Sequence, residues 1–112
     1  MKPNQEKLYH IFRALADKNR FQIMFQLLSG GKCVGDLTML LKLEQTLVSH
    51  HLSVLKKCGL VKTIKIGKWT RCSISPKMLT DIHELFDATF QTQANERDIA
   101  KKKYTPKQKW KF

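Results

Sequence analysis

Residues 45–60 of this 112-residue chain, QTLVSHHLSVLKKCGL, constrain the fold most, because their pattern fits a helix with one buried side. Apolar side chains recur at Val48, Leu52 and Leu55, spaced as on one face of an α-helix. Gly59 follows them and can adopt the left-handed conformation that ends a helix. We therefore predict a helix over residues 45–58 that buries one stripe in a core.

The other side of this predicted helix carries short hydrogen-bonding side chains and a lysine, with no carboxylate. Its residues are Gln45, Thr46, Ser49, His50, Ser53 and Lys56. Such side chains reach base edges and phosphates in the major groove of DNA, whereas an ordinary surface helix mixes glutamate with lysine. The pattern favours double-stranded DNA as the ligand, and a polar surface helix without a partner is the alternative.

The charge balance points to the same class of ligand. The chain carries 21 Lys and Arg against 9 Asp and Glu, a formal net charge of +12. Such a charge attracts polyanions, either a phosphate backbone or acidic lipid headgroups. No apolar run is long enough to span a bilayer or to form a signal peptide, so we expect a cytoplasmic protein with no membrane partner.

Three further helices are predicted before the central one. Each carries apolar side chains at helical spacing and begins after a capping residue or a glycine pair. Their ranges are 5–16 after Asn4, 18–28 after Asp17, and 34 or 36 to 41. Because only residues 42–44 separate the third helix from the helix at 45–58, the two form a helix-turn-helix.

The pattern changes from helical to alternating after Gly59. Residues 60–66 and 69–75 are predicted strands, and Gly67-Lys68 supplies the turn of a hairpin. The hairpin has no acidic residue, and its cations are Lys62, Lys65, Lys68 and Arg71. A basic hairpin after such a helix is typical of the wing of a winged helix-turn-helix, which lies along phosphates or enters a minor groove. The alternative is that edge lysines discourage aggregation.

Ser75-Pro76 predicts the start of a last helix that runs to the mid-nineties. Its apolar face, like that of the first helix, is wider than a small domain covers alone, so we expect a homodimer. The expected dimer contacts are Leu8, Ile11, Phe12, Leu79, Ile82, Phe86 and Phe90. We assign residues 1–100 to one winged-helix domain, and residues 101–112 to a basic tail that stays solvated or contacts nucleic acid.

Four short motifs lie in order between residues 15 and 75. They are Leu15-Ala16-Asp17 with Arg20, Cys33-Val34-Gly35-Asp36-Leu37, Val48-Ser49-His50-His51-Leu52 with Gly59-Leu60-Val61, and Gly67-Lys68-Trp69. Together they closely resemble the ArsR/SmtB family of winged-helix repressors. The resemblance implies a homodimer that binds an imperfect palindrome, blocks transcription and commonly releases DNA when an effector binds. It makes residues 45–58 the recognition helix and 60–75 the wing.

Metal sites known in that family are incomplete here. Cys33-Val34-Gly35 stands where the family has Cys-Val-Cys, so one thiolate is missing. Asp81-Ile82-His83 supplies half of a second family site, and Ala94 and Arg97 occupy the register of its other half. We predict no cofactor and no complete metal site, and the residues that zinc or another metal would use are Cys33, Asp81 and His83.

The cysteine count, an odd three, predicts reduced thiols rather than a disulfide framework. Cys58 and Cys72 could be neighbours behind the wing. Their positions are not those of the redox pair known in the family, so we interpret them as packing residues.

The sequence therefore predicts an α+β, mainly helical fold: a dimeric winged helix-turn-helix of about five helices and a two-stranded hairpin. The predicted function is a sequence-specific transcriptional repressor without a complete metal site. Two alternatives stay open, a basic architectural protein of low sequence preference and a repressor that senses metal or redox state through a non-standard site. We predict no enzymatic activity, because no carboxylate or cleft residue accompanies Ser49, His50 and His51.

Overall fold

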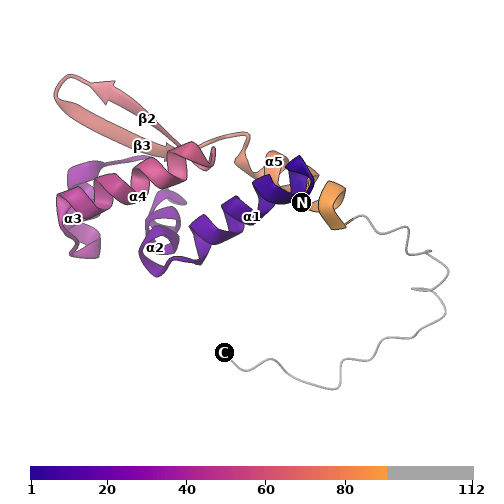
Figure 1. Ribbon diagram of the computed structural model, residues 1–112. Helices are drawn as coiled ribbons and strands as arrows, with labels where there is room; N and C mark the ends of the chain where they lie inside the picture. The colour runs from indigo at the N-terminus through magenta and orange to yellow at the C-terminus, as the bar shows by residue number, and fades with distance from the viewer. Residues whose placement is uncertain (91–112) are drawn as a thin grey trace, which may run out of the picture.

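The computed structural model describes residues 1–90, and the predicted basic tail at 101–112 lies outside the described residues. The elements in order are α1 (Pro3–Ala16), α2 (Lys18–Leu27), β1 (Lys32–Cys33), α3 (Val34–Leu41), α4 (Gln45–Lys57), β2 (Val61–Ile66), β3 (Trp69–Ile74) and α5 (Met78–Phe90). Figure 1 shows α2, α3 and α4 grouped beside the base of the hairpin, with α1 and α5 together at the other end. The predicted winged helix-turn-helix is confirmed.

The first two helices meet at Asp17. The Asp17 carboxylate accepts a hydrogen bond from the Arg20 backbone N–H at 3.1 Å, so the predicted cap of α2 is confirmed. The predicted cap of α1 is wrong, because α1 begins at Pro3 and Lys2 occupies the capping position. Proline suits the first turn of a helix, where its missing N–H leaves no backbone acceptor unpaired.

The helix-turn-helix consists of α3, the residues 42–44 and α4, as predicted. Lys42 ends α3 in the left-handed conformation, with φ of 54°, and its N–H donates to the Thr38 carbonyl. Gly59 closes α4 with φ of 75°, and the Leu60 N–H donates to the Leu55 carbonyl at 3.0 Å. Both helices of the motif therefore end abruptly, and the chain changes direction after each of them.

The hairpin is the predicted one, but the sheet has a third strand. β2 and β3 pair antiparallel from Val61 opposite Ile74 to Ile66 opposite Trp69, and Gly67 turns between them with φ of 62°. β1 pairs with the other edge of β3, which gives the order β1-β3-β2. The two-stranded prediction missed β1 because two residues are too few to show an alternating pattern.

The last helix begins later than predicted. The Ser75 N–H still donates to the Leu60 carbonyl at 3.0 Å, so Ser75 belongs to the base of the hairpin. The chain then turns through residues 76–77, and the Met78 N–H donates to the Ser75 carbonyl at 3.0 Å. The predicted start at Ser75-Pro76 is therefore wrong, and α5 starts at Met78.

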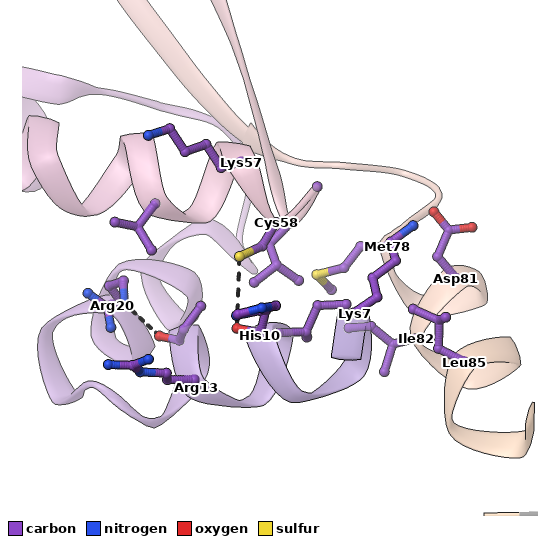
Figure 2. Close-up of a pocket in the computed structure, with 15 residues that line it drawn as sticks. Lys7, His10, Arg13, Arg20, Lys57, Cys58, Met78, Asp81, Ile82 and Leu85 are labelled. Carbon is purple, nitrogen blue, oxygen red and sulfur yellow. Dashed lines mark hydrogen bonds between the residues drawn. The ribbon is translucent and has the colours of Figure 1, made fainter. Parts of the chain in front are cut away.

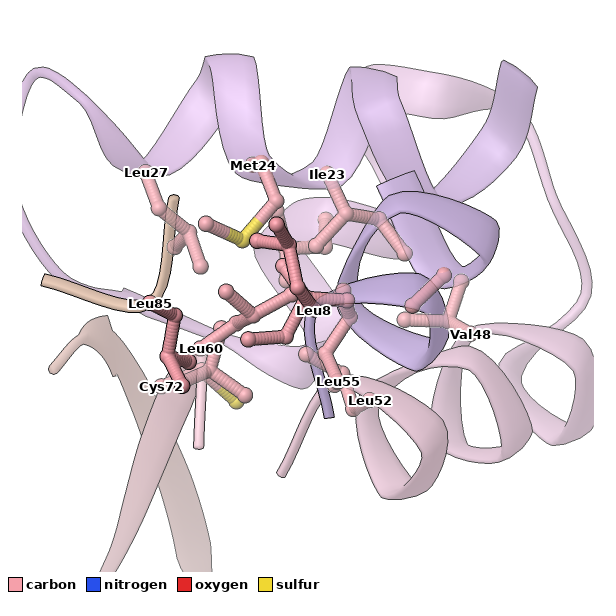
Figure 3. Packing of buried hydrophobic residues seen from close by; sticks show 14 residues of the cluster. Leu8, Ile23, Met24, Leu27, Val48, Leu52, Leu55, Leu60, Cys72 and Leu85 are labelled. Carbon is pink, nitrogen blue, oxygen red and sulfur yellow. The ribbon is translucent and has the colours of Figure 1, made fainter. Parts of the chain in front are cut away.

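Buried side chains from the helices and the hairpin form one core, shown in Figure 3. The core residues are Leu8, Ile11, Ala14, Ile23, Met24, Leu27, Leu37, Val48, Leu52, Leu55, Leu60, Val61, Cys72 and Leu85. The predicted stripe of Val48, Leu52 and Leu55 is confirmed, with exposed fractions of 0%, 4% and 0%. Burial of this stripe turns the polar side of α4 outward.

Truncation of the buried stripe should destabilise the fold. Leu55→Ala should lower the free energy of unfolding by about 2–5 kcal/mol, because it removes apolar contacts and leaves a cavity. Leu47→Ala on the same helix is the matched control, since Leu47 is 37% exposed and should cost less than about 1 kcal/mol. Urea unfolding measures both, and equal losses in the two variants would contradict the placement of the stripe.

Candidate nucleic-acid interface

The outward face of α4 is the first part of the candidate interface. The structure leaves all six predicted residues of this helix exposed: Gln45, Thr46, Ser49, His50, Ser53 and Lys56. They lie opposite the buried stripe, and no carboxylate interrupts them. The face can donate and accept hydrogen bonds and carries positive charge, which is the chemistry that the edges of base pairs and the phosphates require.

The hairpin adjoins this face. The Lys56 ammonium donates to the Thr63 hydroxyl at 3.1 Å, which connects the last turn of α4 to β2. The four predicted cations of the hairpin are exposed: Lys62, Lys65, Lys68 and Arg71. The helix and the hairpin therefore form one polar and basic surface.

The hairpin cations do not share one side of the sheet. In the observed register Lys62 and Ile64 lie opposite Ser73 and Arg71, whereas Lys65 lies opposite Thr70 on the other side. Lys68 sits in the turn, with its ammonium 5.4 Å from the centre of the Trp69 ring. Positive charge therefore surrounds the hairpin.

Arg71 has an additional contact within the protein. Its guanidinium lies over Gly31, where an added Cβ would come within 2.9 Å of Nε. Glycine at this position permits the close approach of the guanidinium to the loop between α2 and β1.

Exposed apolar side chains on the hairpin escaped the sequence analysis. Ile64, Ile66 and Trp69 lie on one side of the sheet and are 52%, 56% and 57% exposed. The alternation in residues 69–75 places Trp69 on the side of the strand opposite Cys72. This pattern could have predicted that Trp69 is exposed. Apolar side chains beside cations suit the minor groove, where proteins insert both kinds of group.

A buried histidine anchors α4 to the first two helices. His51 is 5% exposed, and its Nδ1 lies 3.3 Å from Nη1 of Arg20. Arg20 also donates from Nε to the Ala14 carbonyl at 2.7 Å, so one guanidinium connects the end of α1, the start of α2 and the middle of α4. The predicted recognition helix is thus held by a polar contact as well as by its apolar stripe.

Protonation would weaken this anchor. Burial lowers the pKa of His51, the nearby Asp17 carboxylate opposes that effect, and the Arg20 guanidinium lowers the pKa further. Neutral His51 can accept a hydrogen bond from Arg20, whereas a protonated ring would place two cations together. The hydrogen bond from the Arg20 backbone is the main reason that the pKa of Asp17 is also lowered.

The candidate metal ligands are not brought together. Cys33 occupies the capping position of α3, whereas Asp81 and His83 lie exposed on α5. His83 Nε2 lies 3.3 Å from a carboxylate oxygen of Asp87. Within residues 1–90 no three His, Cys, Asp or Glu side chains lie close enough to hold a metal ion.

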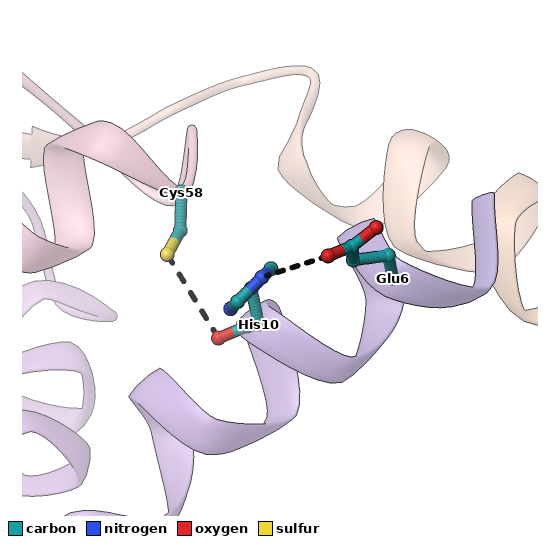
Figure 4. A network of polar contacts seen from close by, with 3 residues as sticks. All are labelled: Glu6, His10 and Cys58. Carbon is teal, nitrogen blue, oxygen red and sulfur yellow. Dashed lines mark hydrogen bonds and ion pairs between the residues drawn. The ribbon is translucent and has the colours of Figure 1, made fainter. Parts of the chain in front are cut away.

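The cysteines have neighbours that the sequence did not indicate. Cys58 Sγ lies 3.9 Å from the His10 carbonyl, and His10 in turn lies 4.0 Å from Glu6, as Figure 4 shows. Cys72 is buried in the core, and this burial raises the pKa of its thiol, with a further contribution from nearby Cys33. Cys33 and Cys72 lie on neighbouring strands, where Cys33 pairs with Arg71 and Lys32 pairs with Cys72. That Cys58 and Cys72 are neighbours stays a prediction.

The surface of α1 and α5 carries exposed aromatic side chains. Phe12 and Phe86 are 6.5 Å apart between ring centres, and Phe86 and Phe90 are 4.8 Å apart. All three are exposed, as is Leu79, whereas Ile82 is half-buried. We call Phe12, Leu79, Phe86 and Phe90 the aromatic patch.

Two of the expected dimer contacts belong to the core. Leu8 and Ile11 are each 2% exposed within this chain, so the core of the chain itself already covers these two expected dimer contacts. The apolar pattern of α1 could not separate the side that faces its own core from the side that faces solvent.

Known proteins share this arrangement. The family model of bacterial regulatory proteins of the arsR family matches residues 17–63, from α2 into β2. The uncharacterized HTH-type transcriptional regulator MJ1325 of Methanocaldococcus jannaschii is 39% identical over 83 residues, which cover 73% of this chain and 93% of that protein. The transcriptional activator HlyU of Vibrio cholerae is 32% identical over 86% of this chain and 88% of its own length. This chain belongs to the ArsR family.

Solved structures agree with the membership of the ArsR family. HlyU from Vibrio cholerae N16961 superposes with a TM-score of 0.66 at 30% identity, over 82% of this chain and 100% of that chain. The ArsR-like regulator from Rhodococcus sp. RHA1 has the same fold, with a TM-score of 0.72 at 24% identity over 86% of this chain and 90% of that chain. The ArsR-family chain is therefore a DNA-binding transcriptional regulator, and its relatives belong to a non-enzyme class.

The part of the chain described, residues 1–90, contains no helix with the length and apolar character needed to cross a membrane.

Acid should destabilise this ArsR-family regulator through His51. The folded protein holds the pKa of His51 below its ordinary value of 6.5, so the unfolded chain binds that proton more tightly. The contribution to stability is therefore complete above about pH 6.5 and is lost as the pH falls through the folded-state pKa. His51→Asn, which keeps an acceptor for Arg20 but cannot titrate, should show a smaller loss of unfolding free energy between pH 7.5 and 5.

Urea unfolding at constant ionic strength measures this pH dependence. His83→Asn, which replaces an exposed histidine of α5 that is not among the groups that shift the pKa of His51, is the control and should keep the dependence of the parent protein. The same acid slope in His51→Asn and the parent protein would show that another group is responsible.

Proposed function

We propose that this regulator is a cytoplasmic repressor that binds a palindromic operator as a homodimer. The observation that carries the proposal is the exposed, carboxylate-free face of α4 beside a basic hairpin. One relative, the arsenical resistance operon repressor of Escherichia coli, is 32% identical over 81% of this chain. Repression requires only that the bound dimer occupies promoter DNA.

In the proposed complex α4 lies in the major groove. Ser49 and His50 are exposed near the middle of the helix and are suited to base edges, with Gln45, Thr46 and Ser53 beside them. Lys56 is already bonded to Thr63, so it stiffens the junction with the hairpin while its charge attracts phosphate. Catalysis has no part in this proposal, because His51 is buried and supports the fold.

The hairpin supplies contacts that do not depend on sequence. Lys62, Lys65, Lys68 and Arg71 project from both sides of the sheet, so the hairpin can contact phosphates on both sides of a minor groove. The exposed Ile66 and Trp69 at its tip can then pack against sugars.

A second copy of the chain is the proposed partner for the aromatic patch. Phe12, Leu79, Phe86 and Phe90 are 42–74% exposed, and water contact with so many large apolar side chains is unfavourable. A two-fold axis through α1 and α5 would place two α4 helices on one side of the dimer, about one turn of DNA apart. We also propose that no resident metal is required, since Cys33 lies on a different element from Asp81 and His83.

Helix and hairpin substitutions should have different effects on DNA binding. Ser49→Ala should reduce the preference for an operator over random duplex, at a cost of about 1–3 kcal/mol in discrimination, because it removes a base contact. Lys65→Ala should weaken binding to both duplexes alike and lower the slope of log affinity against log salt by about one. Fluorescence anisotropy from 50 to 200 mM salt, with an operator selected from a random pool, measures both.

Thr80→Ala is a control for the first variant, since Thr80 is exposed on α5, outside α4 and the hairpin. Equal losses on all duplexes from Ser49→Ala and Lys65→Ala would contradict base recognition by α4. A parent protein with no preference for any selected duplex would instead favour the architectural alternative.

The aromatic patch should be required for the dimer. Phe86→Ser should shift the protein from dimer to monomer and weaken operator binding at least tenfold, because two half-sites would no longer be held together. Phe25→Ser is the control: Phe25 is 64% exposed on α2, outside the patch, and should leave the dimer intact. Sedimentation equilibrium measures the oligomeric state of each variant. A parent protein that is monomeric at micromolar concentration would overturn the proposed homodimer.

A further inference from the structure

A cavity of about 610 Å³ lies where α1, the end of α4 and the start of α5 meet. Figure 2 shows side chains of these three elements facing one another across it. Its floor is apolar and buried or half-buried, and it consists of Ile11, Val54, Leu60, Met78, Ile82 and Leu85. The volume falls within the range of about 300–1,000 Å³ that is typical of sites for small molecules.

Cations surround the rim of this cavity. Lys7, Arg13 and Lys57 are exposed on the rim, and Asp81 is the single carboxylate among the described lining residues. Within residues 1–90 the ion pairs join His10 to Glu6 and His83 to Asp87, so none of these three cations forms an ion pair, and they outnumber the one carboxylate of the lining. An apolar floor below an excess of positive charge is complementary to an anion with an apolar body.

The cavity and the aromatic patch lie on different sides of the same helices. On α1 the cavity uses Lys7, Ile11 and Ala14, which are spaced as one helical stripe, whereas Phe12 points elsewhere. On α5 it uses Met78, Ile82 and Leu85, and Phe86 and Phe90 are displaced around the helix. The residues of the aromatic patch are therefore not lining residues of the cavity.

Arg20 connects the cavity to the proposed DNA-binding helix. It lines the cavity, and the same guanidinium contacts His51 of α4 at 3.3 Å. A carboxylate bound beside Arg20 would compete with His51 for that guanidinium and loosen the anchor of α4. An apolar body between Ile82 of α5 and Val54 of α4 would also contact both of these helices.

We propose that this cavity is an effector site for a small organic carboxylate with an apolar body. The bound carboxylate is held between Arg13 and Arg20, its body rests on the apolar floor, and the complex has a lower affinity for operator DNA. The proposed ligand site depends only on the cavity. The proposed effect on DNA affinity rests on the function proposed above.

The first test uses 2-naphthoate as the probe and the methionine methyl groups as reporters. In the full chain labelled with ¹³C at these methyls, titration should shift the Met78 signal, because Met78 lines the cavity. The Met39 signal should not move, since Met39 is 79% exposed on α3 and outside the cavity. The neutral analogue 2-naphthylmethanol should bind at least about fivefold more weakly. An unmoved Met78 signal, or equal affinity for the alcohol, would overturn the site.

A substitution of one cation, with a matched control, tests where the carboxylate of the ligand binds. Arg13→Gln should weaken 2-naphthoate binding at least about fivefold, whereas Lys18→Gln, which removes an exposed cation outside the cavity, should not change it. Circular dichroism checks that both variants fold. Equal affinity of the two variants would show that Arg13 does not hold the carboxylate.

The second test measures operator affinity by anisotropy with saturating 2-naphthoate. The parent protein should bind its operator at least about fivefold more weakly, and Arg13→Gln should lose this response at the same ligand concentration. Unchanged affinity with a shifted Met78 signal would overturn the coupling and leave the ligand site intact. A parent protein that binds no operator even without ligand would overturn the proposed function, and the methyl titration would still decide the site.

Discussion

Burial of one stripe of α4 is the constraint on which the rest of the structure depends. Val48, Leu52 and Leu55 lie in the core, so the opposite side of the same helix must face solvent. That side has no carboxylate and is where the candidate DNA contacts gather. The orientation of α4 is therefore set by the hydrophobic effect, and a polar link from His51 to Arg20 adds a specific attachment to α1 and α2. Apolar packing supplies the free energy, and the polar link makes the position of the helix sensitive to charge.

The hairpin depends on the same core. Val61 and Cys72 are buried at its base, so the sheet is anchored while its tip extends from the body of the protein, as Figure 1 shows. Lys56 joins the end of α4 to Thr63, and Arg71 lies over Gly31 on the other side of the sheet. The first contact restrains the hairpin relative to α4, and the second restrains it relative to the loop between α2 and β1. Two surfaces that are proposed to contact the same duplex are thus held in one geometry before DNA arrives, which lowers the entropic cost of binding.

Helices α1 and α5 contribute to the core, to the aromatic patch and to the cavity, whose floor shares Ile11 and Leu85 with the core. One side of each helix contributes to the core through Ile11 and Leu85, a second side carries Phe12 and Phe86, and the rim of the cavity includes Lys7 and Asp81. Because the cavity also borders the end of α4, a ligand there would contact the proposed dimer helices and the proposed DNA-binding helix at once. This arrangement offers a direct route from ligand to DNA affinity, since coupling requires an element that both sites contact.

Local patterns in the sequence determined the helix-turn-helix, the cap at Asp17, the hairpin turn at Gly67-Lys68 and the side of α4 that is buried, because each depends on residues that are near in the chain. Tertiary structure decided the remainder. Strand β1 forms because β3 has a free edge for it, α5 starts late because Ser75 pairs with Leu60, and Cys33 comes to lie beside β3 through this third strand. Leu8 and Phe12 look alike in sequence, yet one is buried and the other exposed. Such differences depend on which elements pack together. Contacts between segments that are distant in the chain cannot be predicted from the pattern of neighbouring residues.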